Sequence, residues 1–332
     1  MNSAAPLLQV NSLVKGFPAR RSLAALMRGE KPRALQAVRG VSLELATGET
    51  LGLVGESGCG KSTLGRCIAG LYRPTSGSVF YRGEPLHGRE TRRQSSRRVQ
   101  MIFQDPYASL NPQLSVERTL AEVIRVHGLA KGRSAIADRV DELLLQVGLS
   151  PQAKSQLPHT FSGGQRQRIS IARALAVEPE IIIADEPVSA LDVSIQAQIV
   201  NLFIELRERL GLAYLFIAHD LNVVRHVSDR IAVMYLGQIV EVAATRELFR
   251  QPGHPYTRSL LSAIPKPDPD HRSHSVSLEG ELPDPHFPPS GCNFNTRCPL
   301  VVERCRIESP ELLEHSPARA VRCHRAFQVE VG

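Results

Sequence analysis

A lysine followed by two hydroxyl residues closes a glycine-rich stretch near the start of the chain. The stretch fits the pattern G-x-x-x-x-G-K-[ST], in which glycines let the backbone wind tightly and point its N–H groups at phosphate oxygens. In such a loop Lys61 reaches the terminal phosphates of a nucleotide, and the Ser62 hydroxyl ligates Mg²⁺. Cys59 occupies a free position of the pattern, and we assign it no chemistry of its own. The whole stretch is Gly55, Glu56, Ser57, Gly58, Cys59, Gly60, Lys61, Ser62 and Thr63.

Two adjacent carboxylates follow an apolar run later in the chain. Asp185 and Glu186 come directly after residues 181–184, which are Ile-Ile-Ile-Ala. A solvated pair at the end of a strand is the alternative interpretation, but a phosphate-binding loop upstream favours chemistry. We expect Asp185 to hold the Mg²⁺ shell. We expect Glu186 to orient or deprotonate an attacking water.

The elements that position these residues alternate along the chain. Continuous apolar runs are typical of parallel strands that are buried on both faces, and apolar residues at helical spacing separate them. Strands alternating with helices predict an α/β fold. Strands are predicted over residues 7–14, 41–45, 51–54, 181–184 and 213–218, and helices over residues 62–71, 134–147 and 195–210.

Length and composition are those of a globular chain of about two domains. The 332 residues are 42% hydrophobic and 22% charged, with a formal net charge of +7. The positive charge is spread out, with small arginine clusters at residues 20–21, 92–93 and 97–98. A solvated basic surface explains it, and a surface against an anionic bilayer is the alternative. We find no signal peptide and no run of 18 apolar residues, so we expect a cytosolic chain.

Composition changes after about residue 252, where proline and histidine become frequent. Four of the six cysteines lie beyond this point. We therefore expect two domains, over residues 1–252 and 253–332. We expect the second to be a small loop-rich appendage, a domain separate from the one that holds the ATP site, and we expect any cluster in it to be structural rather than catalytic.

A short segment with a serine and two glycines indicates which kind of nucleotide-binding protein this is. It resembles the signature of ABC ATPases, with phenylalanine where leucine is most common. The resemblance implies a P-loop α/β core with a helical subdomain at about residues 105–175. A helix that starts near Gln165 aims its N-terminus and the Ser162 hydroxyl at an anion. The resemblance implies that this anion is the γ-phosphate of ATP bound by a second subunit. The segment is Phe161, Ser162, Gly163, Gly164 and Gln165.

Other segments resemble further elements of this family, in the family's order. Gln104 resembles the Q-loop glutamine, which senses γ-phosphate and Mg²⁺, and His219 resembles the switch histidine. Phe17 is our candidate for the aromatic that stacks on adenine, although residues 19–34 place it farther from the phosphate loop than is usual. The D-loop, which crosses the interface between two ATPase subunits, is represented by Ser189, Ala190, Leu191 and Asp192.

Five further segments resemble those of ATPase subunits from the dipeptide and oligopeptide importers. They are residues 104–112, 185–194, 254–257, 280–283 and 288–292. The arginines after the signature favour the F-type over the D-type ATPase of these systems. The resemblance implies a heterodimer with a D-type ATPase, two membrane permease subunits and an extracytoplasmic peptide-binding protein. It implies a peripheral location on the cytoplasmic face of the inner membrane.

Two alternatives to peptide import stay open. Related importers carry nickel, glutathione or opines. A soluble ABC ATPase acting on nucleic acid or ribosomes is the other, but such proteins usually carry a coiled-coil insertion or two tandem cassettes. This chain has neither, so we expect no nucleic-acid partner.

The four tail cysteines are Cys292, Cys298, Cys305 and Cys323, separated by five, six and seventeen residues. Zinc modules usually open with C-x₂₋₄-C, so the wider spacing disfavours zinc. The spacing also departs from the bacterial ferredoxin pattern. Importer ATPases with a similar tail include some that carry a [4Fe–4S] cluster, so the resemblance implies this cofactor beside ATP and Mg²⁺. Zinc and unligated thiols are the alternatives.

Overall fold

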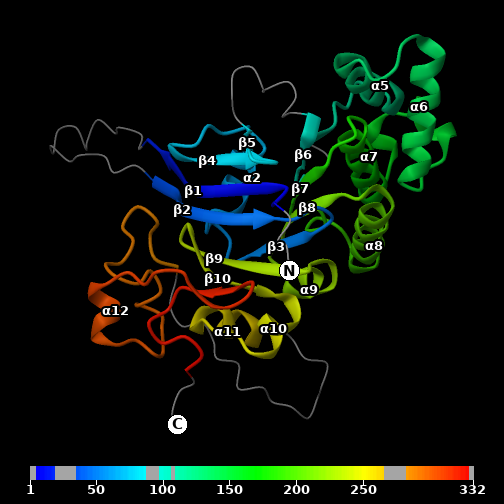
Figure 1. Ribbon diagram of the computed structural model, residues 1–332. Helices are drawn as coiled ribbons and strands as arrows, with labels where there is room; N and C mark the ends of the chain where they lie inside the picture. The colour runs from blue at the N-terminus through cyan, green and yellow to red at the C-terminus, as the bar shows by residue number, and fades with distance from the viewer. Residues whose placement is uncertain (1–4, 19–34, 87–96, 106–108, 265–281, 329–332) are drawn as a thin grey trace, which may run out of the picture.

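A computed structural model describes residues 5–18, 35–86, 97–105, 109–264 and 282–328. The basic insertion at residues 19–34 therefore lies outside the described residues. Two β-sheets and a group of helices make up the described chain (Figure 1). Within these ranges no helix is long and apolar enough to cross a membrane.

The larger sheet has eight strands, and its central strands are parallel. Every residue of β7 (Ile181–Asp185) and β8 (Ala213–Ile217) is buried, which confirms the prediction of parallel strands covered on both faces. The strand order is β11 (Leu313–Ser316), β12 (Arg319–Val321), β10 (Gln238–Ala244), β9 (Arg230–Tyr235), β3 (Thr50–Val54), β8, β7 and β6 (Val99–Ile102).

The smaller sheet is antiparallel and covers a second core. It consists of β2 (Leu35–Leu45), β1 (Leu8–Phe17), β4 (Ser76–Tyr81) and β5 (Glu84–Pro85), in that order. Helix α2 (Lys61–Ile68) contributes Leu64, Cys67 and Ile68 to the core between the two sheets. Helix α2 thus begins with the lysine of the phosphate loop and is held in place by its apolar face.

Helices α5 (Val116–His127), α6 (Arg133–Gln146) and α7 (Gly163–Leu175) lie together at one side of the sheets (Figure 1). All three fall within the range predicted for a helical subdomain. The helix predicted over residues 134–147 is α6, and the one predicted over residues 195–210 is α8 (Val193–Leu210).

The C-terminal region packs on the larger sheet. It begins with α11 (Pro255–Ser262), and its later elements α12 (Glu303–Ile307), β11 and β12 are short. Strand β12 pairs with β10, so the tail extends the larger sheet. Residues 293–297 of this predicted second domain contact both β2 and the phosphate loop of the first.

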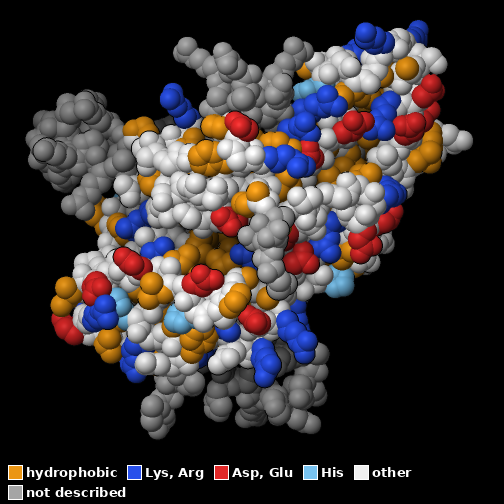
Figure 2. Space-filling model, in the orientation of Figure 1, with side chains coloured by type: hydrophobic (Ala, Val, Ile, Leu, Met, Phe, Trp, Pro, Cys, Tyr) orange, Lys and Arg blue, Asp and Glu red, His pale blue; other side chains and the backbone are white. Residues whose placement is uncertain are grey.

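Charged side chains of both signs are interspersed on the face shown in Figure 2, without one continuous basic field. Of the three arginine clusters, the pairs at 20–21 and 92–93 lie outside the described residues. Arg97 and Arg98 make ion pairs with Glu178 and Glu180. The basic cluster that can be described is therefore paired with acids.

Candidate functional site

The glycine-rich loop joins β3 to α2 and is packed tightly against its neighbours. Gly55 and Gly60 have φ values of 152° and 108°. A Cβ at Gly55 would lie 2.1 Å from the carbonyl oxygen of Met234, and one at Gly60 would lie 2.1 Å from that of Ala37. Only glycine fits these two positions, so the pattern seen in the sequence reflects both a backbone conformation and a close approach.

The ammonium of Lys61 lies inside the loop. Its side chain is buried, and Nζ donates to the carbonyl oxygens of Gly55 at 2.8 Å and Glu56 at 3.0 Å. The third contact, to the Cys59 sulfur at 3.9 Å, is the weakest. An ammonium has three donors, so the donor that makes only this long contact can instead serve a phosphate oxygen.

The residues expected at the metal are in contact. The Ser62 hydroxyl donates to Oδ1 of Asp185 at 2.7 Å, and Arg66 lies 3.9 Å from Oδ2. Burial raises the pKa of Asp185, while the Ser62 hydrogen bond and nearby cations act in the opposite direction. A buried carboxylate beside a hydroxyl at the start of a helix offers the oxygen ligands that Mg²⁺ prefers, so these residues fit the ion.

Two residues from the ends of neighbouring strands converge on one carboxylate oxygen of Glu186, which follows the strand between them. Gln104 follows β6 and donates from Nε2 to Oε2 of Glu186 at 3.0 Å. His219 follows β8, and its Nδ1 lies 3.3 Å from the same oxygen. Glu186 itself has a φ of 48°, a conformation that non-glycine residues rarely adopt and that is enriched at functional sites.

A small cavity adjoins this carboxylate. It measures about 40 Å³ and is lined by Glu186, Ser189, Gln196 and His219, among others. A cavity of roughly 10–15 Å³ is enough to hold one water, so a nucleophilic water fits beside Glu186.

The signature segment forms the N-terminus of α7. The Ser162 Oγ accepts the N–H of Gln165 at 3.3 Å, and the Gln165 side chain accepts the N–H of Ser162 at 3.0 Å. This capping box leaves the Ser162 hydroxyl proton able to point at an anion. A Cβ at Gly164 would lie 2.5 Å from the Ile195 side chain, so glycine lets α7 pack closely on α8. Phe161 is buried.

The predicted D-loop links the backbone of Glu186 to the signature. The Ser189 hydroxyl donates to the carbonyl oxygen of Glu186 at 3.0 Å. A Cβ at Gly163 would lie 3.2 Å from the Leu191 side chain, so these two segments touch within one chain. Asp192 directly precedes α8.

Phe17 ends β1 and is half-buried. Its ring meets Tyr72 edge-to-face at 5.6 Å, and Nζ of Lys15 lies 5.0 Å above it. The sequence analysis did not identify Tyr72, which follows α2. An aromatic pair with a cation nearby is suited to an adenine ring and its phosphates.

Two further residues at the phosphate loop were missed. Arg297 contacts both carboxylate oxygens of Glu56, at 3.0 and 3.1 Å. The Tyr256 hydroxyl accepts the Glu56 N–H at 2.9 Å. Tyr256 belongs to the segment 254–257, which carried only a family resemblance, and Arg297 directly precedes a tail cysteine. The cysteine pattern was the one signal that could have directed attention to Arg297.

The four tail cysteines lie near one another. Burial raises the pKa of Cys292 to about 11 and of Cys298 to about 12, and the thiols of Cys305 and Cys323 add to both shifts. The backbone N–H of Cys292 donates to the carbonyl oxygen of Cys305 at 2.8 Å. Among the described residues, however, no three Cys, His, Asp or Glu side chains are arranged to hold a metal ion. Within these residues the structure therefore supports neither the predicted [4Fe–4S] cluster nor the zinc alternative.

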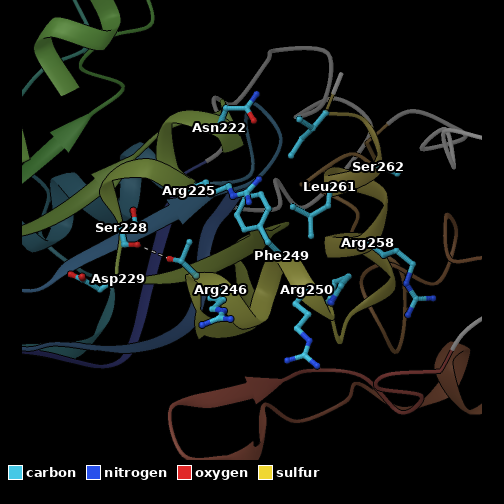
Figure 3. Close-up of a pocket in the computed structure, with 13 residues that line it drawn as sticks. Asn222, Arg225, Ser228, Asp229, Arg246, Phe249, Arg250, Arg258, Leu261 and Ser262 are labelled. Atoms are coloured by element: carbon cyan, nitrogen blue, oxygen red, sulfur yellow. Dashed lines mark hydrogen bonds between the residues drawn. The ribbon is translucent and has the colours of Figure 1, made fainter. Parts of the chain in front are cut away.

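A separate groove of about 970 Å³ lies between α9 (Leu221–Val227), α10 (Thr245–Arg250) and α11 (Figure 3). Its polar lining includes Arg225, Arg246 and Arg250, and Arg225 lies 5.0 Å above the ring of Phe249. None of the residues predicted to bind nucleotide lines it. The groove is therefore distinct from the site built around Lys61.

Comparison with protein families gives two matches. The family described as "ABC transporter" matches residues 38–189. The family described as "Oligopeptide/dipeptide transporter, C-terminal region" matches residues 240–305. The first match contains the glycine-rich loop and the signature, and the second contains Arg297 and three of the tail cysteines.

Solved structures share the fold. CbiO1 of Clostridium perfringens, part of the ABC transporter complex CbiONQ, has a TM-score of 0.62 at 26% identity, covering 74% of this chain and 91% of that one. The ATP-binding cassette MJ0796, solved as a dimer with ADP and phosphate after hydrolysis, has a TM-score of 0.61 at 29% identity, covering 72% and 99%. These likenesses confirm the predicted ABC ATPase fold.

Relatives resemble the chain over most of its length. The oligopeptide transport ATP-binding protein OppF of Salmonella typhimurium is 52% identical over 89% of both chains. The oligopeptide transport ATP-binding protein AppF of Bacillus subtilis is 49% identical over 96% of this chain and 97% of its own. With the phosphate loop, the paired acids and the signature all in place, the chain belongs to the family of ATP-binding, ATP-hydrolysing subunits of oligopeptide ABC transporters.

Proposed function

We propose that the chain hydrolyses ATP to drive uptake of dipeptides or oligopeptides through membrane permease subunits. The observation that carries this proposal is the convergence of Gln104 and His219 on one oxygen of Glu186, beside a cavity for one water. The peptide substrate is supported by the names of the relatives and by the C-terminal family match.

In this proposal Lys61 and the loop N–H groups bind the β- and γ-phosphates, and Ser62 and Asp185 hold Mg²⁺. The ion neutralises phosphate charge when bound. Glu186 accepts a proton from the attacking water, while Gln104 and His219 orient the carboxylate. Phe17, with Tyr72, contacts the adenine.

The site is completed by a second ATPase subunit of the D-type. Ser162 and its neighbouring glycines contact the nucleotide held by that subunit, and residues 189–192 cross the interface. This arrangement is supported by the exposure of Ser162 at the N-terminus of α7 and by MJ0796, which was solved as a dimer. The segment around Gln104 contacts the permeases on the cytoplasmic face of the membrane, and a peptide-binding protein delivers the substrate outside.

Replacing Lys61 with alanine tests the nucleotide site. We expect ATP hydrolysis by the purified transporter to fall close to background, because the charge on the terminal phosphates is lost. Lys154→Ala is the matched control, since it removes an ammonium that pairs with Asp141 at 2.8 Å. Near-normal turnover of Lys61→Ala would refute the assignment, and uptake assays with the cognate binding protein would identify the substrate.

We also propose that residues 253–332 form a unit with its own cofactor, a [4Fe–4S] cluster held by Cys292, Cys298, Cys305 and Cys323. The proposal rests on the family resemblance of the tail and on the proximity of these thiols, and it requires the thiols to move, because no three of them are arranged to hold a metal ion among the described residues. The cluster would supply a cross-link between loops of a region with few regular elements. Anaerobically purified protein should be brown and contain about four iron and four sulfide per chain. Colourless protein with stoichiometric zinc, or metal-free protein with an ordered tail, would contradict it.

A further inference from the structure

One acidic residue of the phosphate loop is bound on three sides. The carboxylate of Glu56 contacts Arg297, its N–H donates to the Tyr256 hydroxyl, and its carbonyl oxygen accepts from Lys61. Both peptide groups of Glu56 are thus engaged, so their orientation is fixed before a nucleotide binds. The N–H groups that follow in the loop depend on that orientation, because successive peptide planes share one backbone.

Arg297 is held in place by the body of the protein. Its side chain is only 5% exposed, and Nη1 lies 3.5 Å from the hydroxyl of Tyr235. Earlier in the same segment, Phe294 packs its ring 5.3 Å from Tyr235 and 5.5 Å from Tyr256. Asn293 accepts from Arg39 at 2.9 Å and donates to Gln238 at 2.7 Å.

The negative charge of Glu56 is unfavourable in a loop that binds phosphate. A carboxylate in a loop that binds phosphate repels the ligand, and Glu56 is partly buried, with a side chain 24% exposed. The Arg297 guanidinium neutralises this carboxylate, and its Nη1 donates to both carboxylate oxygens. Buried ion pairs contribute little to stability in general, so a gain in folding stability does not by itself explain the pair.

We propose that Arg297 is a positioning residue of the nucleotide site: through Glu56 it sets the conformation of the phosphate loop and neutralises a charge that opposes ATP. The segment between Cys292 and Cys298 thereby acts on nucleotide affinity. This inference rests on the proposed nucleotide site around Lys61.

The two roles predict an order of affinities. Arg297→Ala removes the contact and leaves an unpaired carboxylate, so the Kd for ATP should rise about tenfold, which is about 1.4 kcal/mol. Glu56→Gln removes the contact together with the negative charge, and its Kd should rise only about two- to threefold. The double variant should resemble Glu56→Gln, so the second change should restore most of the affinity lost in Arg297→Ala.

The test is titration of the full-length chain with a fluorescent ATP analogue, together with KM and kcat for ATP in the assembled transporter. We expect the effect in Kd and KM, with kcat changed less than threefold. Arg304→Ala is the matched control, because it breaks an exposed ion pair with Glu308 in the same tail. An unchanged Kd in Arg297→Ala would overturn the proposal.

The double variant distinguishes the positioning role of Arg297 from a purely structural one. If Arg297→Ala weakens binding because the tail unfolds, adding Glu56→Gln will not restore affinity, and that result would also overturn the proposal. Lys61→Ala is the reference for the site itself. If Lys61→Ala binds ATP and turns over normally, the site assignment fails and this inference fails with it. If Lys61→Ala is inactive while the Arg297 series has unchanged affinity, only this inference fails.

Discussion

Replacing Glu186 with glutamine tests the base directly. Oε2 of Glu186 accepts from Gln104 at 3.0 Å and lies 3.3 Å from Nδ1 of His219. A glutamine has the same shape, and its amide oxygen can still accept from Gln104. We therefore expect the free energy of unfolding to change by less than about 1 kcal/mol.

The rate of hydrolysis should change far more than stability. An amide cannot take a proton from water near neutral pH, so the general-base contribution is lost. That contribution is typically about 10²–10⁴-fold, which corresponds to about 2.7–5.4 kcal/mol in the barrier. Lys61, Ser62 and Asp185 are untouched, so the affinity for ATP should stay within about threefold of the wild type. The ATP-bound pair of subunits should remain closed.

Single-turnover hydrolysis and subunit closure, measured on the same preparation, check this expectation. Glu178→Gln is a well-matched control. Glu178 also has a positive φ, 56°, but its side chain is 59% exposed and forms surface ion pairs. The control should hydrolyse ATP normally. Hydrolysis by Glu186→Gln within about tenfold of the wild type, or loss of ATP binding, would refute the role given to Glu186.

The remaining predictions concern three other residues. Photo-crosslinking in the heterodimer should label Ser162 with an ATP analogue bound by the partner subunit; labelling by nucleotide bound at the same chain's Lys61 would refute the shared site. If the proposed cluster is present, Cys298→Ser should lose iron, and it should raise the Kd for ATP because Arg297 is its neighbour; unchanged iron content would exclude Cys298 as a ligand. Burial lowers the pKa of His254 from 6.5 to about 3, so folded-state stability should fall as pH falls through 6.5, by about 2 kcal/mol at about pH 5. His254→Asn, which can still accept the Tyr256 N–H, should flatten this profile in denaturation experiments, and an equally steep profile would contradict the assignment.

Much of the catalytic geometry follows from the sequence, because each motif ends a strand. Gln104, Glu186 and His219 follow β6, β7 and β8, which are neighbours in the sheet. The carboxyl ends of parallel strands meet at one edge, so residues after adjacent strands converge there. The motifs are contiguous segments of a few residues, and local pattern is sufficient to find them.

The contacts of Arg297 and Tyr256 could not be found in this way. Arg297 lies 241 residues beyond Glu56, and no periodicity or turn pattern links the two. Arg297 and Glu56 meet because the tail packs on β10 and because Phe294 packs on Tyr235 and Tyr256. Both contacts are properties of the folded chain. The change of composition near residue 252 predicted a second domain, but it gave no indication that this domain contacts the phosphate loop.

The choice of glutamate at position 56 therefore has to be explained together with the tail. The pattern of the phosphate loop leaves this position free, and a negative charge there is unfavourable for an anionic ligand unless a cation is bound to it. Arg297 supplies that cation from a segment between two cysteines, and its burial holds the guanidinium in one place. Whatever stabilises residues 292–298 then also keeps the carboxylate neutralised. Whatever loosens them exposes the nucleotide to an unpaired charge and to a less ordered loop. The C-terminal region is for this reason part of the nucleotide site in its energetics, although it contributes no residue that we expect to touch ATP.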